Sequence, residues 1–490
     1  MLELSPTHLS TVFNLMGLLI RENRIEDARS LVKKAKALNK NALEWHLTEL
    51  VLDIPTLAKS QAEIAECRVK LREKLDFLEN ARLRPLNINN IRANLFPLAY
   101  HGIDDLAILK RVSKLVRRSC DLNQVRPSKA QSKNKVRVGF LSGYIYQHTI
   151  GVLNRGLIEK LCREKFEIVL LHVSGTRRDQ LHMNLNQLAD SVCYLSTDVS
   201  QAASQVRQMN LDILHYLDIG MNSFSYLLAH FRLAPTQSTS WGHPMTTGID
   251  TIDYFISFDA AEPQDAQQNY SEALVCFESP PVYYYDPVIE NQDVDVSVDL
   301  PEGNLYGCMQ SLFKLHPEFD LVLDRILELD PEAQIVLVEA AEETLTQELK
   351  DRWRNAFPRI SSRSLFLPRM SRETFLGVTQ KMTVLLDTPY FGSGNTLYES
   401  LCMGIPSVTW PGPFMRARIA AGLYEHMGIK NAPVASSLAE YAEIAVALAT
   451  SSSVLGELKS ALLDRSSLLY EDDAVVKEFE RTFEVWRDRH

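Results

Sequence analysis

Beyond residue 135 the sequence alternates short apolar runs with longer amphipathic stretches, and this alternation limits the possible folds more than any other feature. The apolar runs are rich in β-branched residues, and the stretches between them, such as residues 153–161 and 320–329, have helical spacing. Strands that alternate with helices in this way build parallel sheets whose two faces are covered. The sequence therefore predicts an α/β fold, with strands at residues 136–141, 168–173, 213–217, 254–257, 335–338, 384–386 and 407–410.

This α/β part is too long for a single sheet, because hydrophobic cores stop growing at roughly 250–300 residues. The stretch from Pro280 to Pro287 and the segment Leu300-Pro-Glu-Gly interrupt it. We therefore expect two Rossmann-like domains, at residues 136–285 and 301–490, joined by a connector at 286–300 and facing each other across a cleft. Ligands of such folds bind outside the carboxyl ends of the strands, where loops enter helices.

Residues 1–125 differ, because their apolar side chains recur at helical spacing without strand-like alternation. Residues 13–31 resemble one tetratricopeptide unit, in which the small residues Gly17 and Ala28 would allow two antiparallel helices to approach closely. Such units bury their faces only against neighbours, so a single unit indicates a remnant array or a capping domain. We predict an all-helical, tetratricopeptide-like domain at residues 1–125 and a polar linker at 126–135.

The overall charge and the cysteine pattern argue against several classes of protein. The net charge of −10 disfavours a general nucleic-acid binder, although residues 110–137 are strongly basic. We interpret this basic run as a solvated helix face and linker, with a polyanion-binding surface as the alternative. The seven cysteines form no C-x-x-C pair and are odd in number, which indicates buried free thiols rather than disulfides or a zinc ribbon.

Neither a membrane span nor an export signal is expected. No stretch of the sequence approaches about 18 uncharged apolar residues, and the segment that begins at Met1 lacks the basic residues of a signal peptide. The sequence therefore predicts a soluble, cytoplasmic protein.

Two loops in the first α/β domain carry candidate functional residues. His148 lies in the loop after residues 136–141, where an imidazole can act as a general base or orient a substrate. A lone histidine is more often a hydrogen-bonded structural residue, so spacing alone leaves these roles open. The second loop, Trp241-Gly-His-Pro-Met-Thr-Thr-Gly, suits a sugar or a phosphate, or is an ordinary turn; its candidates are Gly242, His243, Pro244, Thr246 and Thr247.

A third loop, Asp387-Thr-Pro-Tyr-Phe-Gly-Ser-Gly-Asn-Thr-Leu-Tyr-Glu, combines a strand end, a Gly-rich turn and a helix start. Backbone N–H groups at a helix N-terminus, together with the helix dipole, bind anions such as a diphosphate. Glu399, one turn into this helix, is placed to accept hydrogen bonds from a ribose. The loop lacks the Gly-Lys-Ser/Thr of a Walker loop and the last glycine of the dinucleotide fingerprint. Its candidate anion-binding residues are Gly392, Gly394, Asn395 and Thr396.

Several segments, taken together and in order, resemble one known family. They are Arg232-Leu-Ala-Pro-Thr-Gln-Ser-Thr-Ser-Trp-Gly-His-Pro, Ile252-Asp-Tyr-Phe-Ile, Tyr270-Ser-Glu-Ala-Leu-Val, Leu386-Asp-Thr-Pro and Gly404-Ile-Pro-Ser-Val-Thr-Trp-Pro-Gly. Over residues 136–445 the chain resembles the catalytic region of the O-linked N-acetylglucosamine transferases and, equally, of the bacterial adhesin-modifying N-glucosyltransferases of the same glycosyltransferase family. An N-terminal helical part fits, because members of this family carry helical repeats or an all-helical domain there.

The resemblance implies an enzyme with a GT-B-type pair of Rossmann-like domains that inverts the anomeric centre and needs neither a metal nor another cofactor. It would transfer glucose or N-acetylglucosamine from a UDP-sugar to a Ser, Thr or Asn side chain of an acceptor protein. The first α/β domain would face the acceptor, and the second would bind the UDP-sugar. No nucleic-acid partner is implied.

The resemblance also assigns roles to individual residues. His148 lies where the family has its active-site histidine, and Lys314 matches the lysine that contacts the donor diphosphate. The assignment of Lys314 is physically reasonable, because without a metal the departing UDP needs a fixed cation and oriented amides. The donor-binding residues that the resemblance implies are Arg369, Met370, Arg372, Phe375, Gly392, Gly394, Asn395, Thr396 and Glu399.

Some positions depart from the family pattern and leave the donor sugar open. Arg372 stands where a lysine is usual, Phe375 where a uracil-stacking histidine is expected, and Glu399 where an aspartate is usual. Gly394-Asn-Thr replaces the His-Thr-Thr of the O-linked N-acetylglucosamine transferases and is closer to the N-glucosyltransferases. Tyr144 replaces an acidic residue of the animal enzymes.

Two alternative functions are compatible with the sequence. The same fold could act on a glycan or a small molecule, or the protein could be a non-catalytic nucleotide-sugar-binding scaffold. The motif Asp293-Val-Asp resembles the Asp-x-Asp that holds Mn²⁺ in a different glycosyltransferase fold. Because it lies in an acidic connector with no strand before it, we predict no metal site.

Overall fold

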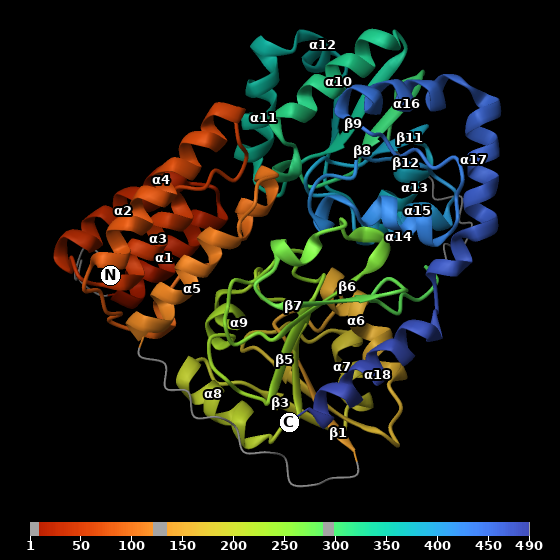
Figure 1. The fold of residues 1–490 in the computed structure, drawn as a ribbon. Coiled ribbons are helices and arrows are strands. Elements are labelled where there is room, and N and C mark those ends of the chain that lie inside the picture. The colour runs from red at the N-terminus through yellow and green to blue at the C-terminus, as the bar shows by residue number, and fades with distance from the viewer. Residues whose placement is uncertain (1–8, 121–134, 288–297, 490) are drawn as a thin grey trace.

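The computed structural model describes residues 9–120, 135–287 and 298–489. The described chain forms a helical region and two parallel sheets, with helices packed around each sheet (Figure 1). This arrangement confirms the predicted fold class, an all-helical part followed by a GT-B-type pair of Rossmann-like units. Asp293 and Asp295, like most of the expected linker and connector, lie outside the described residues.

The first sheet is formed by residues between 136 and 277. In the described chain its strands are all parallel, in the order β3-β2-β1-β4-β5-β6-β7. These strands are β1 (Val136–Ser142), β2 (Phe166–His172), β3 (Ser191–Tyr194), β4 (Ile213–Tyr216), β5 (Thr236–Ser240), β6 (Tyr254–Phe258) and β7 (Ala273–Phe277). The helices between them are α6 (Thr149–Lys160), α7 (Gln180–Leu188), α8 (Val199–Gln208), α9 (Ser223–Leu228), η3 (Asp259–Ala261) and η4 (Ala266–Asn269).

The second sheet is formed by residues between 304 and 408. Its described strands are again parallel, in the order β10-β9-β8-β11-β12, namely β8 (Asn304–Cys308), β9 (Ala333–Val338), β10 (Ser364–Leu367), β11 (Val384–Leu386) and β12 (Ser407–Val408). The helical elements of this part and of the C-terminal segment are η5 (Leu312–Lys314), α10 (Pro317–Leu329), α11 (Glu343–Ala356), α12 (Pro358–Ser362), α13 (Arg372–Gln380), α14 (Asn395–Cys402), η6 (Met415–Ala417), α15 (Ile419–His426), α16 (Leu438–Thr450), α17 (Ser452–Arg465), η7 (Ser466–Leu469) and α18 (Asp473–Asp488).

Each predicted strand overlaps a strand of the structure, but the sequence patterns missed β3, β5, β7, β8 and β10. The clearest miss is β5, whose sequence Thr-Gln-Ser-Thr-Ser is polar and yet fully buried. Two of its hydroxyls are satisfied internally, because Thr239 donates to Tyr216 O at 2.9 Å and Ser238 Oγ lies 2.9 Å from His215 Nδ1. A buried strand that hydrogen-bonds its own polar side chains escapes a search for apolar runs.

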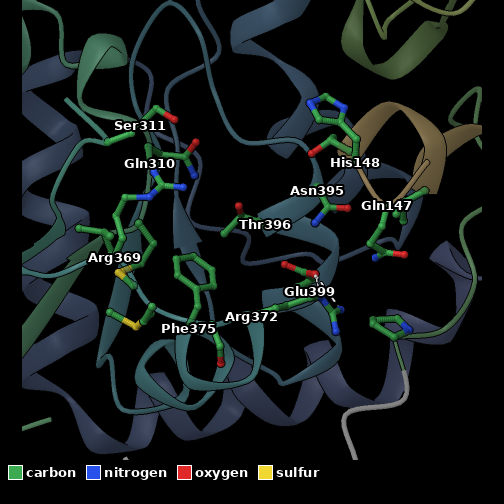
Figure 2. A pocket seen from close by; sticks show the side chains of 18 of the residues that line it. Gln147, His148, Gln310, Ser311, Arg369, Arg372, Phe375, Asn395, Thr396 and Glu399 are labelled. Atoms are coloured by element: carbon green, nitrogen blue, oxygen red, sulfur yellow. Dashed lines mark hydrogen bonds and ion pairs between the residues drawn. The ribbon is translucent and has the colours of Figure 1, made fainter. Parts of the chain in front are cut away.

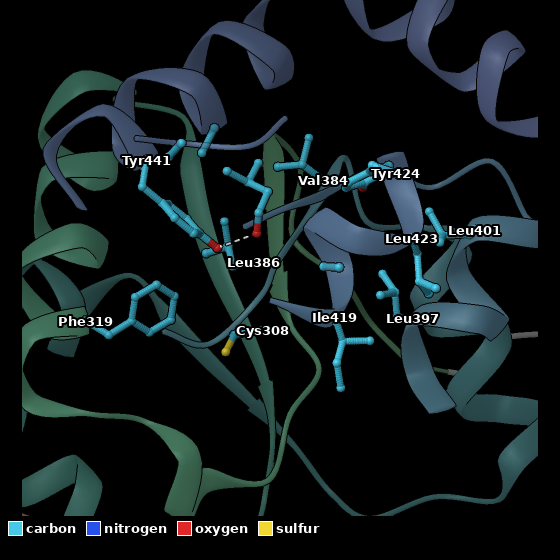
Figure 3. Close-up of a cluster of buried hydrophobic side chains, with 14 of the residues drawn as sticks. Cys308, Phe319, Val384, Leu386, Leu397, Leu401, Ile419, Leu423, Tyr424 and Tyr441 are labelled. Carbon is cyan, nitrogen blue, oxygen red and sulfur yellow. Dashed lines mark hydrogen bonds between the residues drawn. The ribbon is translucent and has the colours of Figure 1, made fainter. Parts of the chain in front are cut away.

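The core of the second domain lies between its sheet and the helices around it. Figure 3 shows side chains from β8, β11, α10, α14, α15 and α16 meeting in this cluster. Tyr441 is fully buried there, and its hydroxyl donates to the backbone oxygens of Asp387 and Val408 at 2.9 and 2.8 Å. The end of β11 is thereby fixed, and the loop of residues 387–396, called the donor loop here after its predicted role, follows it directly.

The helix α18 belongs to the first sheet, although the sequence assigned residues 301–490 to one domain. Its apolar side chains, among them Phe479, Phe483 and Trp486, pack in one cluster with Val138 and Phe140 of β1. Figure 1 shows the blue C-terminal segment running from the second domain down to the first. The sequence did not indicate this crossing, because an amphipathic helix shows which face it buries but not which sheet covers that face.

The helical region consists of α1 (Leu9–Arg21), α2 (Ile25–Leu38), α3 (Leu43–Leu52), α4 (Gln61–Asn80), η1 (Ile88–Asn90), η2 (Phe96–His101) and α5 (Leu106–Cys120). Ala28 of α2 is fully buried in the apolar cluster that α1, α2 and α3 form, as expected for a tetratricopeptide-like pair of helices. The expected role of Gly17 is wrong, because a Cβ atom there would meet nothing within 4 Å. Close helix approach therefore depends on Ala28 and not on Gly17.

This helical region contacts both α/β domains. Asn89 donates to Asp198 of the first domain at 2.9 Å, and Arg352 of the second domain donates to Ala58 O at 2.7 Å. Most of the described part of the basic run lies in α5, where Arg111 pairs with Glu79 and Arg117 with Asp250. These two cations thus face acids of the chain itself.

In the described ranges, no single helix has both the length and the apolar character of a membrane span. The segments Leu438–Thr450 and Ser452–Asp488 meet those criteria only as a pair, by length and composition, and they are bent by 96° at their break.

Candidate active site

A cavity of about 970 Å³ lies between the two α/β domains. It opens at the carboxyl end of β1 on one side and of β8, β9, β10 and β11 on the other, where ligands of parallel sheets bind. Figure 2 shows His148 and Gln147 across the cavity from Arg369, with Thr396 between them. The predicted site residues that line it are His148, Arg369, Met370, Arg372, Phe375, Asn395, Thr396 and Glu399.

His148 caps the N-terminus of α6 from the first domain. Its Nδ1 accepts a hydrogen bond from Ile150 N at 3.2 Å, and its ring stacks on Tyr144 with centroids 4.6 Å apart. Burial lowers the pKa of His148, so the ring is neutral at pH 7. Because Nδ1 accepts, the neutral ring carries its proton on Nε2 and offers the cavity a hydrogen-bond donor.

The N-terminus of α14 faces the cavity through Asn395 and Thr396. The first N–H groups of a helix have no partner within the helix, and they lie at the positive end of its dipole. The Asn395 side chain is oriented by Tyr284, whose hydroxyl donates to Asn395 Oδ1 at 2.6 Å. This end of α14 is therefore suited to an anion, as the Gly-rich sequence predicted.

Glu399 is the buried carboxylate of the cavity. Its Oε1 accepts from Nε and Nη2 of Arg372, at 3.0 and 2.8 Å. Both bonds go to the same oxygen, so Oε2 is left for another donor on the cavity side. A buried carboxylate with one occupied oxygen can accept hydrogen bonds from a pair of sugar hydroxyls.

Arg369 and Phe375 complete the side of the cavity formed after β10. Within the described residues the exposed Arg369 guanidinium has no hydrogen bond or ion pair, so its charge is available to a ligand. Phe375 packs with Met370 against the apolar cluster of Leu367 and Val378. Its ring is partly buried and supported from behind, which suits stacking by a planar base.

Lys314 and Gly392 stand behind this surface rather than on it. Lys314 Nζ donates to Gln310 Oε1 at 2.8 Å and to Gly392 O at 2.9 Å. Burial lowers the pKa of Lys314 to about 8, and the nearby charge of Asp387 opposes that shift. Lys314 thus ties the first loop of the second domain to the donor loop and places a cation under it.

Asp387 organises the donor loop from inside the protein. Its Oδ1 accepts from the backbone N and the hydroxyl of Ser393, at 2.6 and 2.7 Å, and its Oδ2 accepts from Thr409 at 2.9 Å. A Cβ atom at Gly392 would lie only 2.7 Å from Oδ2, so the loop needs glycine there. Gly394, by contrast, has nothing within 4 Å of its Cβ position, although it precedes α14 as predicted.

The loop at residues 241–250 does not contribute to the cavity. Its candidates Gly242, His243, Pro244, Thr246 and Thr247 line none of it. The hydroxyls that sequence reasoning offered to a sugar are used internally, since Thr246 and Thr247 both donate to the buried Glu272. Likewise His243 Nδ1 accepts from Gly220 N at 2.6 Å. The structure thus favours the alternative of a hydrogen-bonded turn.

Sequence reasoning missed three residues that orient the site, Tyr284, Gln310 and Asp387. Gln310 links two loops, because its Nε2 donates to Ser393 Oγ at 2.7 Å while its Oε1 accepts from Lys314. Tyr284 lies in the tyrosine-rich stretch that had marked only a domain boundary. The sequence feature that could have identified Tyr284 as a site residue was its position between the two predicted domains, next to the expected cleft. In the ranges that the structure describes, no three His, Cys, Asp or Glu side chains cluster as a metal site.

Comparison with solved structures identifies the same fold elsewhere. A mutant of the O-GlcNAc transferase of Thermobaculum terrenum superposes with a TM-score of 0.76 at 22% sequence identity, over 99% of this chain and 92% of that one. At this identity the likeness establishes the fold.

Curated relatives are similar in sequence over part of their length. The chain is 30% identical to the probable UDP-N-acetylglucosamine–peptide N-acetylglucosaminyltransferase SPINDLY of Arabidopsis thaliana, over 54% of this chain and 29% of that protein. It is 26% identical to SEC of the same plant, over 72% and 37%. It is 23% identical to the UDP-glucose:protein N-beta-glucosyltransferase of Actinobacillus pleuropneumoniae, over 52% and 41%. The chain thus spans well under half the length of these relatives.

The family model for glycosyl transferase family 41 matches residues 87–283 and 295–476. The match includes both sheets and most of the residues that line the cavity between them. It begins at residue 87, within the helical region, whereas the sequence motifs had suggested a start at residue 136. Since it covers more than half of the sequence, the chain belongs to glycosyl transferase family 41.

Proposed function

We propose that this protein transfers glucose or N-acetylglucosamine from a UDP-sugar to a Ser, Thr or Asn side chain of an acceptor protein. The observation that carries the proposal is the cavity at the carboxyl ends of β8–β11, where a helix N-terminus, a carboxylate and an aromatic ring line one space. Family membership supports it, as do the names of relatives that use UDP-N-acetylglucosamine or UDP-glucose with peptides or proteins.

The uracil, the ribose and the diphosphate of the donor each have a matching group in the cavity or directly behind it. The uracil stacks on Phe375, and the ribose hydroxyls donate to Glu399 Oε2. The diphosphate lies at the N-terminus of α14, over Lys314 and near Arg369. Asn395 at the start of α14, Lys314 and Glu399 are held by hydrogen bonds within the protein before the donor arrives, so the developing charge of the departing UDP is stabilised with little reorganisation.

The proposed reaction inverts the anomeric centre. The acceptor oxygen or nitrogen attacks the anomeric carbon on the face opposite UDP, and the bond to the diphosphate breaks with its electron pair leaving on UDP. Lys314 and the α14 amides take up that charge, so we propose that no divalent ion is required. The Nε2 proton of His148 favours a role in positioning, and the acceptor proton passes to a donor phosphate oxygen.

The test is a transfer assay with radiolabelled UDP-glucose and UDP-N-acetylglucosamine, combined with intact-mass analysis of proteins co-expressed with the chain. We expect a hexose or N-acetylhexosamine increment on protein, and loss of transfer in Lys314→Met. A wild-type protein that binds UDP and transfers nothing would support the scaffold alternative. An increment on glycans alone would support the glycan acceptor.

Two further measurements address the finer claims. Transfer in EDTA at the rate seen with Mn²⁺ is expected, and activity that needs added metal would contradict metal independence. NMR of the glycosylated product should show the β-anomer from the α-linked donor, and retention would contradict inversion. The cytoplasmic location expected from the sequence stays a prediction.

A further inference from the structure

The segment of residues 96–105 in the helical region reaches the back of the donor loop. The Tyr100 ring lies 4.9 Å from the Phe391 ring and 5.1 Å from the Phe313 ring, centroid to centroid. Phe391 immediately precedes Gly392, and Phe313 immediately precedes Lys314. The 96–105 segment therefore packs against the residue before Gly392 in the donor loop and against the residue before Lys314, whose side chain donates a hydrogen bond to that loop.

A close backbone contact fixes the same region. Gly102 has φ +67°, and a Cβ atom there would lie 2.2 Å from the Tyr390 ring, so only glycine fits. Tyr390 itself has φ +67°, a conformation that costs free energy for a side chain of this size. Its ring is held in place by His316 at 4.4 Å and Trp410 at 5.3 Å. The loop before Gly392 is thus kept in a strained form by its surroundings.

Arg416 joins the donor loop to the 96–105 segment through buried hydrogen bonds. Its guanidinium donates to Ala99 O at 3.0 Å, to Ile103 O at 3.2 Å and to Asp105 at 3.1 Å. Its own backbone oxygen accepts from Gly392 N at 2.8 Å. The side chain is only 4% exposed, and that of Asp105 only 2%.

These contacts form one continuous series. Asp105 holds the Arg416 side chain, the Arg416 carbonyl holds Gly392 N, and Gly392 O holds Lys314 Nζ at 2.9 Å. Every link is a hydrogen bond between buried or partly buried groups, so a shift at one end displaces the next. Arg416 does not touch the cavity, and it can act only through Gly392 and Lys314.

We propose that Arg416 is a positioning residue for the donor diphosphate. The 96–105 segment of the helical region, which holds the Arg416 side chain, then helps to form the donor site. The proposal rests on the function proposed above, because it takes UDP as the ligand of the cavity. In this view the helical region sets where Gly392 and Lys314 lie before the donor binds.

The experiment measures UDP affinity by calorimetry, and donor KM and kcat by UDP release, for full-length Arg416→Met and Arg416→Lys. We expect Arg416→Met to weaken UDP binding about tenfold, the effect of losing one charge-assisted hydrogen-bond anchor, and to raise KM more than it lowers kcat. Arg416→Lys keeps the charge but cannot reach all three acceptors, so an intermediate loss is expected. If Arg416→Met does not fold, Arg416→Lys carries the test.

A double mutant separates positioning from general destabilisation. If Arg416 acts through Lys314, then Arg416→Met should weaken UDP binding less than about twofold in a Lys314→Met background. The control is Arg232→Met, which breaks an ion pair with Asp253 inside the first domain and should leave UDP affinity unchanged.

The outcomes distinguish the two proposals. A folded Arg416→Met protein with wild-type UDP affinity overturns the positioning role, and so does an equal loss with and without Lys314. Failure of the wild-type protein itself to bind UDP rejects the proposed function instead.

Discussion

The charge on Lys314 should control how the transfer rate depends on pH. Burial lowers its pKa to about 8, so the side chain is a cation below that pH and neutral above it. With this pKa, roughly three quarters of the free protein carry the charge at pH 7.5 and about one tenth at pH 9. If only the cation stabilises the departing UDP, kcat/KM for the donor falls about eightfold between these pH values.

The assay is the initial rate of UDP release at limiting donor, from pH 6.5 to pH 9.5. In Lys314→Arg the cation persists throughout, because the guanidinium stays protonated, and the alkaline decline should disappear. In Lys314→Met we expect kcat/KM to fall by about 10²–10³, as when an oriented charge-stabilising donor is lost. A wild-type profile that is flat between pH 7 and pH 9, or a decline that persists in Lys314→Arg, refutes this reasoning.

Variants at three further positions test other parts of the structure. Glu399→Ala should raise the donor KM about tenfold, while the KM of Glu399→Asp stays close to that of wild type. A KM of Glu399→Ala equal to that of wild type in steady-state kinetics would argue against the ribose contact. Burial raises the pKa of Asp218 from 3.8 to about 7, so between those values the native state keeps a proton that the unfolded state loses. The stability contributed by this group is therefore lost as pH rises from about 4 to about 7, and Asp218→Asn should be more stable than wild type at pH 8, by at most about 4 kcal/mol in urea unfolding. If Asp218→Asn is no more stable than wild type at pH 8, burying the ionised Asp218 carboxylate does not cost free energy. Leu423→Ala, in the fully buried cluster of Figure 3, should lower the free energy of unfolding by about 2–5 kcal/mol, and a loss below 1 kcal/mol would mean that the site collapses around the gap.

The overall architecture could be predicted because parallel sheets buried on both faces leave a strong sequence signal. The strands β1, β2 and β9 are mostly apolar, and their periodicity differs sharply from that of the first 120 residues. β5 could not be found in this way, since its burial depends on hydrogen bonds to Tyr216 and His215 on the neighbouring strand. Such partners are set by tertiary structure and leave no local periodicity.

In the candidate site, too, some residues could be predicted from local sequence and others could not. The α14 N-terminus and Glu399 follow from local rules, because a helix start, its dipole and a residue one turn later are fixed by short-range geometry. The loop at 241–250 has the same local composition of glycines and hydroxyls, but Glu272 accepts from both Thr246 and Thr247. Composition alone cannot tell whether a hydroxyl faces a ligand or an internal carboxylate.

The anchoring of the donor loop lay furthest from prediction, because it joins residues 311 positions apart. A chain that began after residue 105 would keep both sheets, yet it would leave Arg416 without Asp105 and two of its carbonyl acceptors. A buried guanidinium without partners is far more costly than a solvated one. The second domain therefore depends energetically on the 96–105 segment through these buried hydrogen bonds. Under the proposed function, the catalytic part therefore begins inside the helical region, and the change in sequence pattern near residue 135 does not mark its boundary.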